Sequence, residues 1–150
     1  MITQILVAVD GSDHASRAVD LAADLAERYG AGLTLLHVMS EVGSAAIPPE
    51  LSEYARLEHV RVTERDLFKS AASAIVHAAA ERVASAGHPR PKTRIAEGHA
   101  AQEIIDAAED IDADMIVMGR RGLGGVQSLL LGSTSHKVAH AAPCTVVTVK

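Results

Sequence analysis

The sequence predicts an α/β fold, a single doubly wound domain in which helices cover both faces of a five-stranded parallel sheet. Short apolar runs alternate with helical stretches along the chain, the pattern of strand–helix–strand crossovers. The length of 150 residues suits one domain over 1–150, and no linker or repeat divides it. Apolar residues make up 48% of the chain but aromatic residues only 2%, as expected for small aliphatic side chains packed between helices and a sheet.

The N-terminal half supplies two strands and two helices. Residues 2–9 form an apolar run that predicts a strand, and helical periodicity predicts a helix over 13–29 with Gly30 as its stop. Residues 33–38 are continuously apolar, which favours a second strand covered on both faces. Residues 51–86 predict one long helix. Its buried stripe is expected at Phe68, Ala71, Ala72, Ile75, Ala79 and Val83.

The C-terminal half continues the alternation. Residues 93–96 predict a third strand, and 100–111 predict a helix from the spacing of its apolar positions. Residues 115–118 predict a fourth strand, followed by glycine-rich sequence and a helical stretch from about 125 to 141. A proline then precedes the last predicted strand, 145–149. Such a chain forms one parallel sheet with right-handed connections.

The ends of the first and fourth strands carry the residues of a candidate phosphate site. The segment from Gly119 to Ser133 is rich in glycines, which let backbone N–H groups approach an anion without interference from Cβ. If a helix starts near Gly132, its first N–H groups and hydroxyls can bind phosphate oxygens. Asp10 is an acceptor for ribose hydroxyls. No GxxxxGK[ST] motif occurs, and no GxGxxG follows the first strand. Composition leaves two interpretations open, a phosphate-holding segment or a tight turn without a ligand.

One spacing resembles a known signature. Gly119-x2-Gly122-x9-Gly132-Ser133 is similar to the G-2x-G-9x-G(S/T) signature of ATP-binding universal stress proteins. The resemblance extends along the chain through ILVAVDGSD, LTLLHV, ADMIVMGRRG and APCTVVTV. It implies the strand order 3-2-1-4-5, which places the reversal between the first and fourth strands.

The resemblance also implies site residues and a ligand. Asp10 is expected at the ribose, the backbone of Val38 at the adenine, and the segment after Gly132 at the phosphates of ATP, which would carry Mg²⁺. Ala8 stands where some ATP-binding members have proline. The expected nucleotide-binding residues are Ala8, Val9, Asp10, Val38, Met118, Gly119, Arg121, Gly122, Gly132, Ser133 and Thr134.

Several residues have a plainer alternative. Asp10 can be a helix N-cap, although Ser12 or Asp13 is better placed for that role. We expect one of the two arginines, Arg121 rather than Arg120, to contact phosphate. The alternative is that both are solvated charges of a loop. His136 and His140 have zinc-compatible spacing but favour a structural or surface role. His37 is expected to be a satisfied histidine in the core or at its rim, and Cys144 a buried, inert thiol.

Charge and segment lengths exclude other classes. The net charge of −5 and the lack of a basic stripe argue against binding to nucleic acid. Apolar runs fall far short of the ~18 residues of a membrane span. The N-terminal segment has no basic region ahead of a long apolar stretch, so we expect no signal peptide and a cytoplasmic protein.

The leading hypothesis is therefore an ATP-binding regulatory switch that acts on a protein partner of unknown identity. Two alternatives are a slow ATPase, in which Asp10 or a metal-bound water assists hydrolysis, and an interaction module that needs no nucleotide. We expect no enzyme, or at most a weak ATPase, because no lysine clamp is evident. The last strand, Thr145 to Val149, predicts a homodimer through its free edge, and a covered edge in a monomer is the alternative.

Overall fold

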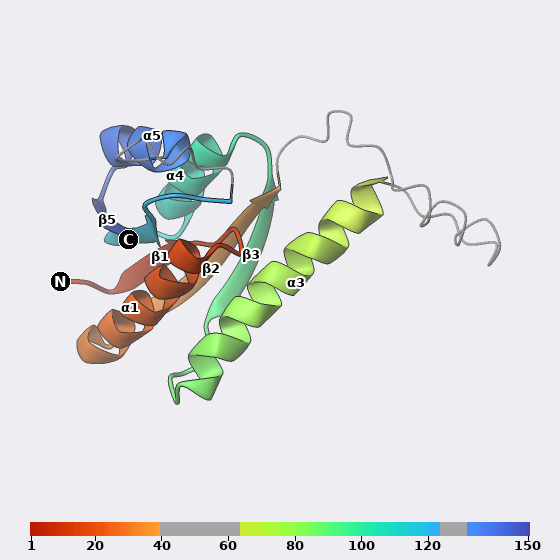
Figure 1. Cartoon of the computed structure of the whole chain (residues 1–150). Coiled ribbons are helices and arrows are strands. Elements are labelled where there is room, and N and C mark those ends of the chain that lie inside the picture. Colours follow the sequence, from red (N-terminus) through yellow and green to blue (C-terminus); the bar gives the residue numbers. More distant parts are fainter. Residues whose placement is uncertain (40–63, 124–131) are drawn as a thin grey trace.

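The computed structural model describes residues 1–39, 64–123 and 132–150, and strands alternate with helices through these ranges (Figure 1). The elements in chain order are β1 (Gln4–Ala8), α1 (Asp13–Tyr29), β2 (Gly32–Met39), α3 (Glu64–Ser85), β3 (Lys92–Glu97), α4 (Ala100–Asp110), β4 (Met115–Gly119), α5 (Ser133–Ala141) and β5 (Thr145–Val149). The predicted alternation is confirmed.

All five strands are parallel and lie in the order β3-β2-β1-β4-β5, so the predicted sheet is confirmed. Central β1 pairs on both sides, with Ile5 opposite Leu33 of β2 and Met115 of β4. The chain builds outward through β2 and β3, then returns to the other side of β1 for β4. The loops after β1 and β4 therefore leave the sheet in opposite directions, which opens a crevice at their carboxyl ends.

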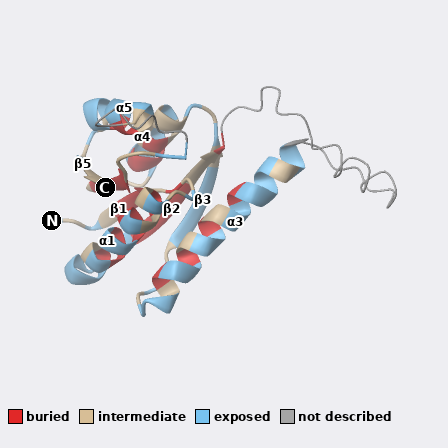
Figure 2. Ribbon diagram, in the orientation of Figure 1, coloured by how far each residue is buried: buried red, intermediate tan, exposed pale blue. Residues whose placement is uncertain are grey.

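Helices cover both faces of the sheet, and the core has two layers. Helices α1 and α3 lie on one face, α4 and α5 on the other, and the buried residues lie between them and the sheet (Figures 1 and 2). Ile5, Val7 and Val117 belong to the first layer, Leu6 and Ile116 to the second. Neighbouring residues thus face opposite covered sides, which explains the continuous apolar runs. Full burial of each such side chain contributes about 1.5–3 kcal/mol.

Helix α1 has the predicted bounds and the predicted stop. Gly30 adopts the left-handed conformation with φ 64°, and its amide and that of Ala31 bond back to the last turn. Ser12 is the N-cap, because its Oγ accepts from the amide of Ala15 at 3.2 Å. Helical periodicity also predicts Tyr29 on the buried stripe of this helix, and that prediction is wrong, because Tyr29 is the last residue of the helix and is 55% exposed.

Helix α3 buries only part of the predicted stripe: Ala72 and Val83 are buried, and Ile75 and Ala79 pack partly buried against the core. Phe68 and Ala71 are exposed, whereas Val76 and Ala80, absent from the predicted stripe, are buried. The reason is tertiary: the early apolar residues of α3 border a cavity at the strand ends instead of lying on the sheet. The part of the predicted long helix before residue 64 falls outside the described residues.

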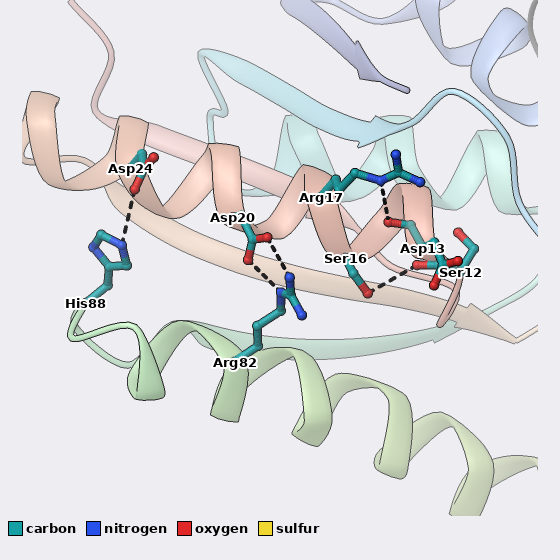
Figure 3. A network of polar contacts seen from close by, with 8 residues as sticks. All are labelled: Ser12, Asp13, Ser16, Arg17, Asp20, Asp24, Arg82 and His88. Carbon is teal, nitrogen blue, oxygen red and sulfur yellow. Dashed lines mark hydrogen bonds and ion pairs between the residues drawn. The ribbon is translucent and has the colours of Figure 1, made fainter.

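Polar contacts fasten α3 to α1 away from that cavity (Figure 3). The guanidinium of Arg82 forms two bonds of 2.6 Å to the carboxylate of Asp20. His88, just after α3, lies between the carboxylates of Asp24 and Glu27. Exposed pairs of this kind contribute about 0–1 kcal/mol each, so they fix the position of α3 more than they stabilise the fold.

The predicted helical stretch from about 125 to 141 is wrong at Gly132. This residue is extended, with φ −67° and ψ 159°, and α5 begins only at Ser133. The amide of Gly132 donates to the carbonyl of Arg120, and this bond turns the chain before the helix starts. Residues 124–131 lie outside the described ranges. Among the described helices, none has the length and apolar character needed to cross a bilayer.

Candidate functional site

The turn after β1 is held by its own polar groups. The amide of Val9 donates to the carbonyl of Leu36, and the carbonyl of Val9 lies 2.8 Å from Nδ1 of His37. Oδ1 of Asp10 accepts from the amide of Ser12 at 2.9 Å. His37 is thus a satisfied histidine at the rim, as expected. Asp10 is not the N-cap of α1, because Ser12 takes that role.

The three signature glycines have three different environments. A Cβ on Gly119 would lie 2.9 Å from Cβ of His14 and 3.0 Å from the amide nitrogen of Ala15, so this glycine allows α1 to approach β4 closely. A Cβ on Gly122 would overlap Oδ2 of Asp10. A Cβ on Gly132 would meet nothing closer than 3.4 Å, an ordinary contact. Neither sterics nor its extended backbone therefore requires glycine at position 132.

The N-terminus of α5 has no side-chain cap. Gly132 occupies the N-cap position and supplies no side chain, and the first helical backbone bond runs from His136 to its carbonyl. Buried Ser135 does not serve the free amides either, because its Oγ donates to the carbonyls of Arg120 (2.9 Å) and Gly132 (3.0 Å). Within the described residues, the amides of Ser133 and Thr134 have no acceptor. A helix N-terminus with free amides is a potential binding site for an anion.

These groups border one cavity of about 620 Å³ at the carboxyl ends of β1, β2 and β4. Its walls differ in character. On the β2 side the lining is apolar, with Val38 and Met39 of β2 and Phe68 and Ile75 of α3. On the β4 side it is polar and glycine-rich, and Asp10 of central β1 lies between the two sides. The size and the mixed lining are typical of a small-molecule site.

All eleven residues predicted for the site line this cavity. They are Ala8, Val9, Asp10, Val38, Met118, Gly119, Arg121, Gly122, Gly132, Ser133 and Thr134. Of the two arginines, Arg121 is among the lining residues and Arg120 is not. Parallel strands bring these distant segments together because their carboxyl ends share one edge of the sheet. The binding of a nucleotide by these residues stays a prediction.

The sequence did not predict the apolar wall of the cavity or the contact of Ser135 with the backbone of Arg120. Phe68, Ala71 and Ile75 were assigned to the core, and only the path of α3 past the strand ends turns them toward the cavity. Ser135 was not singled out, although a small hydroxyl residue in the first turn of a helix is a signal for a backbone contact.

The remaining candidates lie elsewhere. His136 and His140 are exposed on α5, and the described residues contain no cluster of three or more potential metal ligands. Cys144 is half-buried, and burial raises the pKa of its thiol above the ordinary value, which makes it a poor nucleophile.

Comparison with known proteins agrees with this geometry. The family model of the universal stress proteins matches residues 1–150. The chain belongs to the universal stress protein family. A relative from Thermus aquaticus, described as a universal stress protein, is 39% identical over 152 residues, and the match covers 100% of both chains. The solved universal stress protein UspA from Lactobacillus plantarum has a TM-score of 0.78 and 31% identity, with 99% of this chain and 98% of that chain covered.

Two solved members of this family were crystallised with nucleotides. One is a universal stress protein in complex with cAMP, with a TM-score of 0.70, 24% identity, and 99% of this chain and 97% of that chain covered. The other, from Archaeoglobus fulgidus, is a complex with dAMP, with a TM-score of 0.65, 22% identity and full coverage of both chains. At these identities the likeness to the present chain is one of fold.

Proposed function

We propose that this universal stress protein binds ATP in the cavity at the carboxyl ends of β1, β2 and β4 and acts as a nucleotide-dependent regulatory switch. The observation that carries the proposal is the uncapped N-terminus of α5, where the amides of Ser133 and Thr134 border the cavity opposite an apolar wall. A nucleotide has the same division, an apolar base at one end and an anionic chain at the other.

The ligand's orientation follows from the lining. The base belongs against Val38, Ala8 and the apolar side chains of α3, because only that wall lets it leave water. The ribose then falls near Asp10, at the centre of the sheet, with Val9 and Met118 beside it. The phosphates extend to Gly132, Ser133 and Thr134, where backbone amides, the helix dipole and the charge of Arg121 favour an anion.

The nucleotide complexes of the two solved relatives support this assignment. Those proteins hold cAMP and dAMP, which share the adenine base and carry one phosphate each. The preference for a triphosphate in the present chain is proposed because the uncapped start of α5 and the charge of Arg121 give the cavity several groups for anionic oxygens. Mg²⁺ would be carried on the phosphate oxygens, because Asp10 is the single carboxylate among the described lining residues.

A binding role is favoured over rapid hydrolysis. Asp10 and His37 are the candidate bases among the described lining residues, and both are already engaged: one oxygen of Asp10 accepts from the amide of Ser12, and Nδ1 of His37 lies 2.8 Å from the carbonyl oxygen of Val9. Loss of ATP during incubation with wild type and with Asp10→Ala distinguishes the alternatives. We expect background rates for both, and a rate that falls in the variant would favour a slow ATPase.

Thermal unfolding with increasing Mg-ATP tests the proposal directly. A ligand at a hundredfold excess over Kd stabilises the folded state by about 2.7 kcal/mol, so the transition should move up by several degrees. AMP, cAMP and dAMP in parallel titrations measure the nucleotide preference. A transition that stays constant up to millimolar ATP would refute ATP binding, and a larger shift with AMP would refute the triphosphate preference.

We also propose a homodimer through β5, in the cytoplasm, with an as yet unknown protein partner for the switch. β5 is the last strand of the described sheet, and Val146, Val147 and Val149 are only half-buried. An unpaired edge of this composition favours pairing with a second copy. Light scattering should give twice the mass of 15.7 kDa for wild type and the single mass for Val146→Pro. Thr145 and Val149 bond toward β4, so by alternation the amide of Val146 points to the free edge, and proline at this position removes a donor along that edge. A wild-type monomer would contradict the dimer.

A further inference from the structure

The second signature glycine, Gly122, is required by a side chain in the loop after β1, distant in sequence. Its backbone lies outside the left-handed region, since the described glycines with positive φ are Gly11, Gly30, Gly87 and Gly98. Any residue could therefore adopt its conformation. The one nearby group that excludes a side chain is the carboxylate of Asp10, because a Cβ at position 122 would overlap Oδ2 and lie 3.6 Å from the carboxyl carbon.

The two oxygens of Asp10 are thereby held from two directions. Oδ1 accepts from the amide of Ser12 at 2.9 Å, and Oδ2 rests against the bare Cα of Gly122. The carboxylate is short and cannot swing away from a methyl group at position 122 without disturbing the bond to Ser12. Both Asp10 and Gly122 line the cavity, so the contact joins the loop after β1 to the loop after β4 inside the site.

We propose that Gly122 is a positioning residue that acts through Asp10: it leaves the space in which the carboxylate takes the orientation that receives the ribose hydroxyls. This inference rests on the proposed nucleotide site and deepens it. It separates the roles of the signature glycines. Gly119 lets α1 pack against β4, Gly122 holds open the place of a carboxylate, and Gly132 leaves the N-terminus of α5 free of a side-chain cap.

A double-mutant cycle in ligand binding tests this role. The proteins are wild type, Gly122→Ala, Asp10→Ala and the double variant, and the ligands are ATP and 2′,3′-dideoxy-ATP, which lacks both ribose hydroxyls. We expect Gly122→Ala to weaken ATP binding about tenfold when Asp10 is present. In the Asp10→Ala background the same substitution should have no further effect. Both single variants should also lose the preference of wild type for ATP over the dideoxy analogue.

Two results would overturn the proposal. One is additive losses for the two substitutions, which would mean that Gly122 contacts the ligand independently of Asp10. The other is a Gly122→Ala protein that binds more weakly yet keeps the preference for the hydroxyl-bearing nucleotide. Gly132→Ala serves as the matched control, because its effect on binding should add to that of Asp10→Ala.

The same four proteins without nucleotide separate this inference from the proposed function. Gly122→Ala should lower the midpoint of urea unfolding when Asp10 is present and leave it unchanged in the Asp10→Ala background. Equal shifts in both backgrounds would overturn the steric contact. If wild type binds no ATP, the proposed function fails, while this cycle still decides whether Gly122 accommodates the carboxylate. Far-ultraviolet circular dichroism confirms that each variant is folded.

Discussion

The helices α1 and α5 both begin at the carboxyl end of the sheet, but of the two only α1 has a side-chain cap. At α1, Oγ of Ser12 accepts from the amide of Ala15, and Oδ1 of Asp10 accepts from the amide of Ser12. At α5, Gly132 has no side chain to offer, and the hydroxyl of Ser135 turns back to two carbonyls. The third amide of α1, that of Ala15, thus has a side-chain acceptor, whereas the corresponding amide of α5, that of Ser135, has none among the described residues.

This difference indicates where an anion would bind. Both helix ends carry the partial positive charge of the macrodipole, so the charge alone does not distinguish them. The distinction lies in the free donors, because an amide already paired with a serine oxygen has no capacity left for a phosphate. Substitutions at the two helix ends, and at the carboxylate of Asp114 elsewhere in the fold, test this comparison.

Gly119→Ala should have the largest effect, on stability. The new methyl group would lie 2.9–3.0 Å from atoms of His14 and Ala15 in the first turn of α1. Because two of these are backbone atoms, the overlap can be relieved only if α1 moves away from β4. We expect the free energy of unfolding to fall by about 2–3 kcal/mol in urea denaturation.

Gly132→Ala is the matched control for this comparison. Its Cβ meets only ordinary contacts, so the loss should stay below about 1 kcal/mol. Equal losses for the two variants would mean that the close approach of α1 to β4 is not what requires a glycine at position 119.

Removal of the cap of α1 should have the next largest effect. Ser12→Ala leaves the amide of Ala15 without its acceptor, and we expect a loss of about 1 kcal/mol in the free energy of unfolding. Ser133→Ala is the comparison at α5, where the hydroxyl caps no amide of the described residues, and it should change stability by less than about 0.5 kcal/mol. A larger loss from Ser133→Ala would show that α5 is capped in a way that its geometry does not suggest.

A cap added to α5 should move stability and binding in opposite directions. Gly132→Asp places a carboxylate at the N-cap position, which should stabilise the protein without nucleotide by a few tenths of a kcal/mol. The same carboxylate occupies the free amides and repels phosphate, so ATP binding should weaken at least about tenfold. Calorimetric titration measures the affinity. Unchanged affinity in a stabilised variant would remove the N-terminus of α5 from the binding site.

The smallest effect concerns Asp114. Its carboxylate, just before β4, accepts hydrogen bonds from backbone amides at the amino end of β1, the end of the strands opposite the cavity. Oδ2 accepts from the amide and hydroxyl of Thr3 and from the amide of Gln4, and these bonds, that of the Thr3 amide above all, lower the pKa of Asp114 below its ordinary 3.8. The ionised form is thus favoured in the folded state. Its contribution is present above the ordinary pKa and is lost as the pH falls through the lowered one.

Asp114→Asn should therefore be less stable than wild type at neutral pH, and the difference should shrink in acid. Urea unfolding at a series of pH values between about 6 and 2 measures the convergence. Ser12→Ala should show no such convergence, because a hydroxyl cap does not titrate. Parallel curves for wild type and Asp114→Asn would exclude this carboxylate as the source of the pH dependence.

The sequence by itself determined the order of elements and the residues that line the candidate cavity. Apolar periodicity and turn residues act over a few neighbours, so they predicted α1 with both bounds correct and β5 likewise. Parallel strands share a carboxyl edge, which is why loops identified separately after β1 and β4 line one cavity. The signature spacing identified Gly119, Gly122 and Gly132, and the family resemblance implied only that each contacts the nucleotide, the first two beside it and the third at its phosphates.

Only the tertiary structure decided what each glycine does and which face of α3 is buried. The overlap of a Cβ on Gly122 with Asp10, and of one on Gly119 with α1, depends on contacts between segments more than 100 residues apart. The stripe of α3 shifted toward Val76 and Ala80 because its early residues pass the end of the sheet and border the cavity. Helical periodicity records which residues share a face, whereas packing decides whether that face meets a sheet or a ligand.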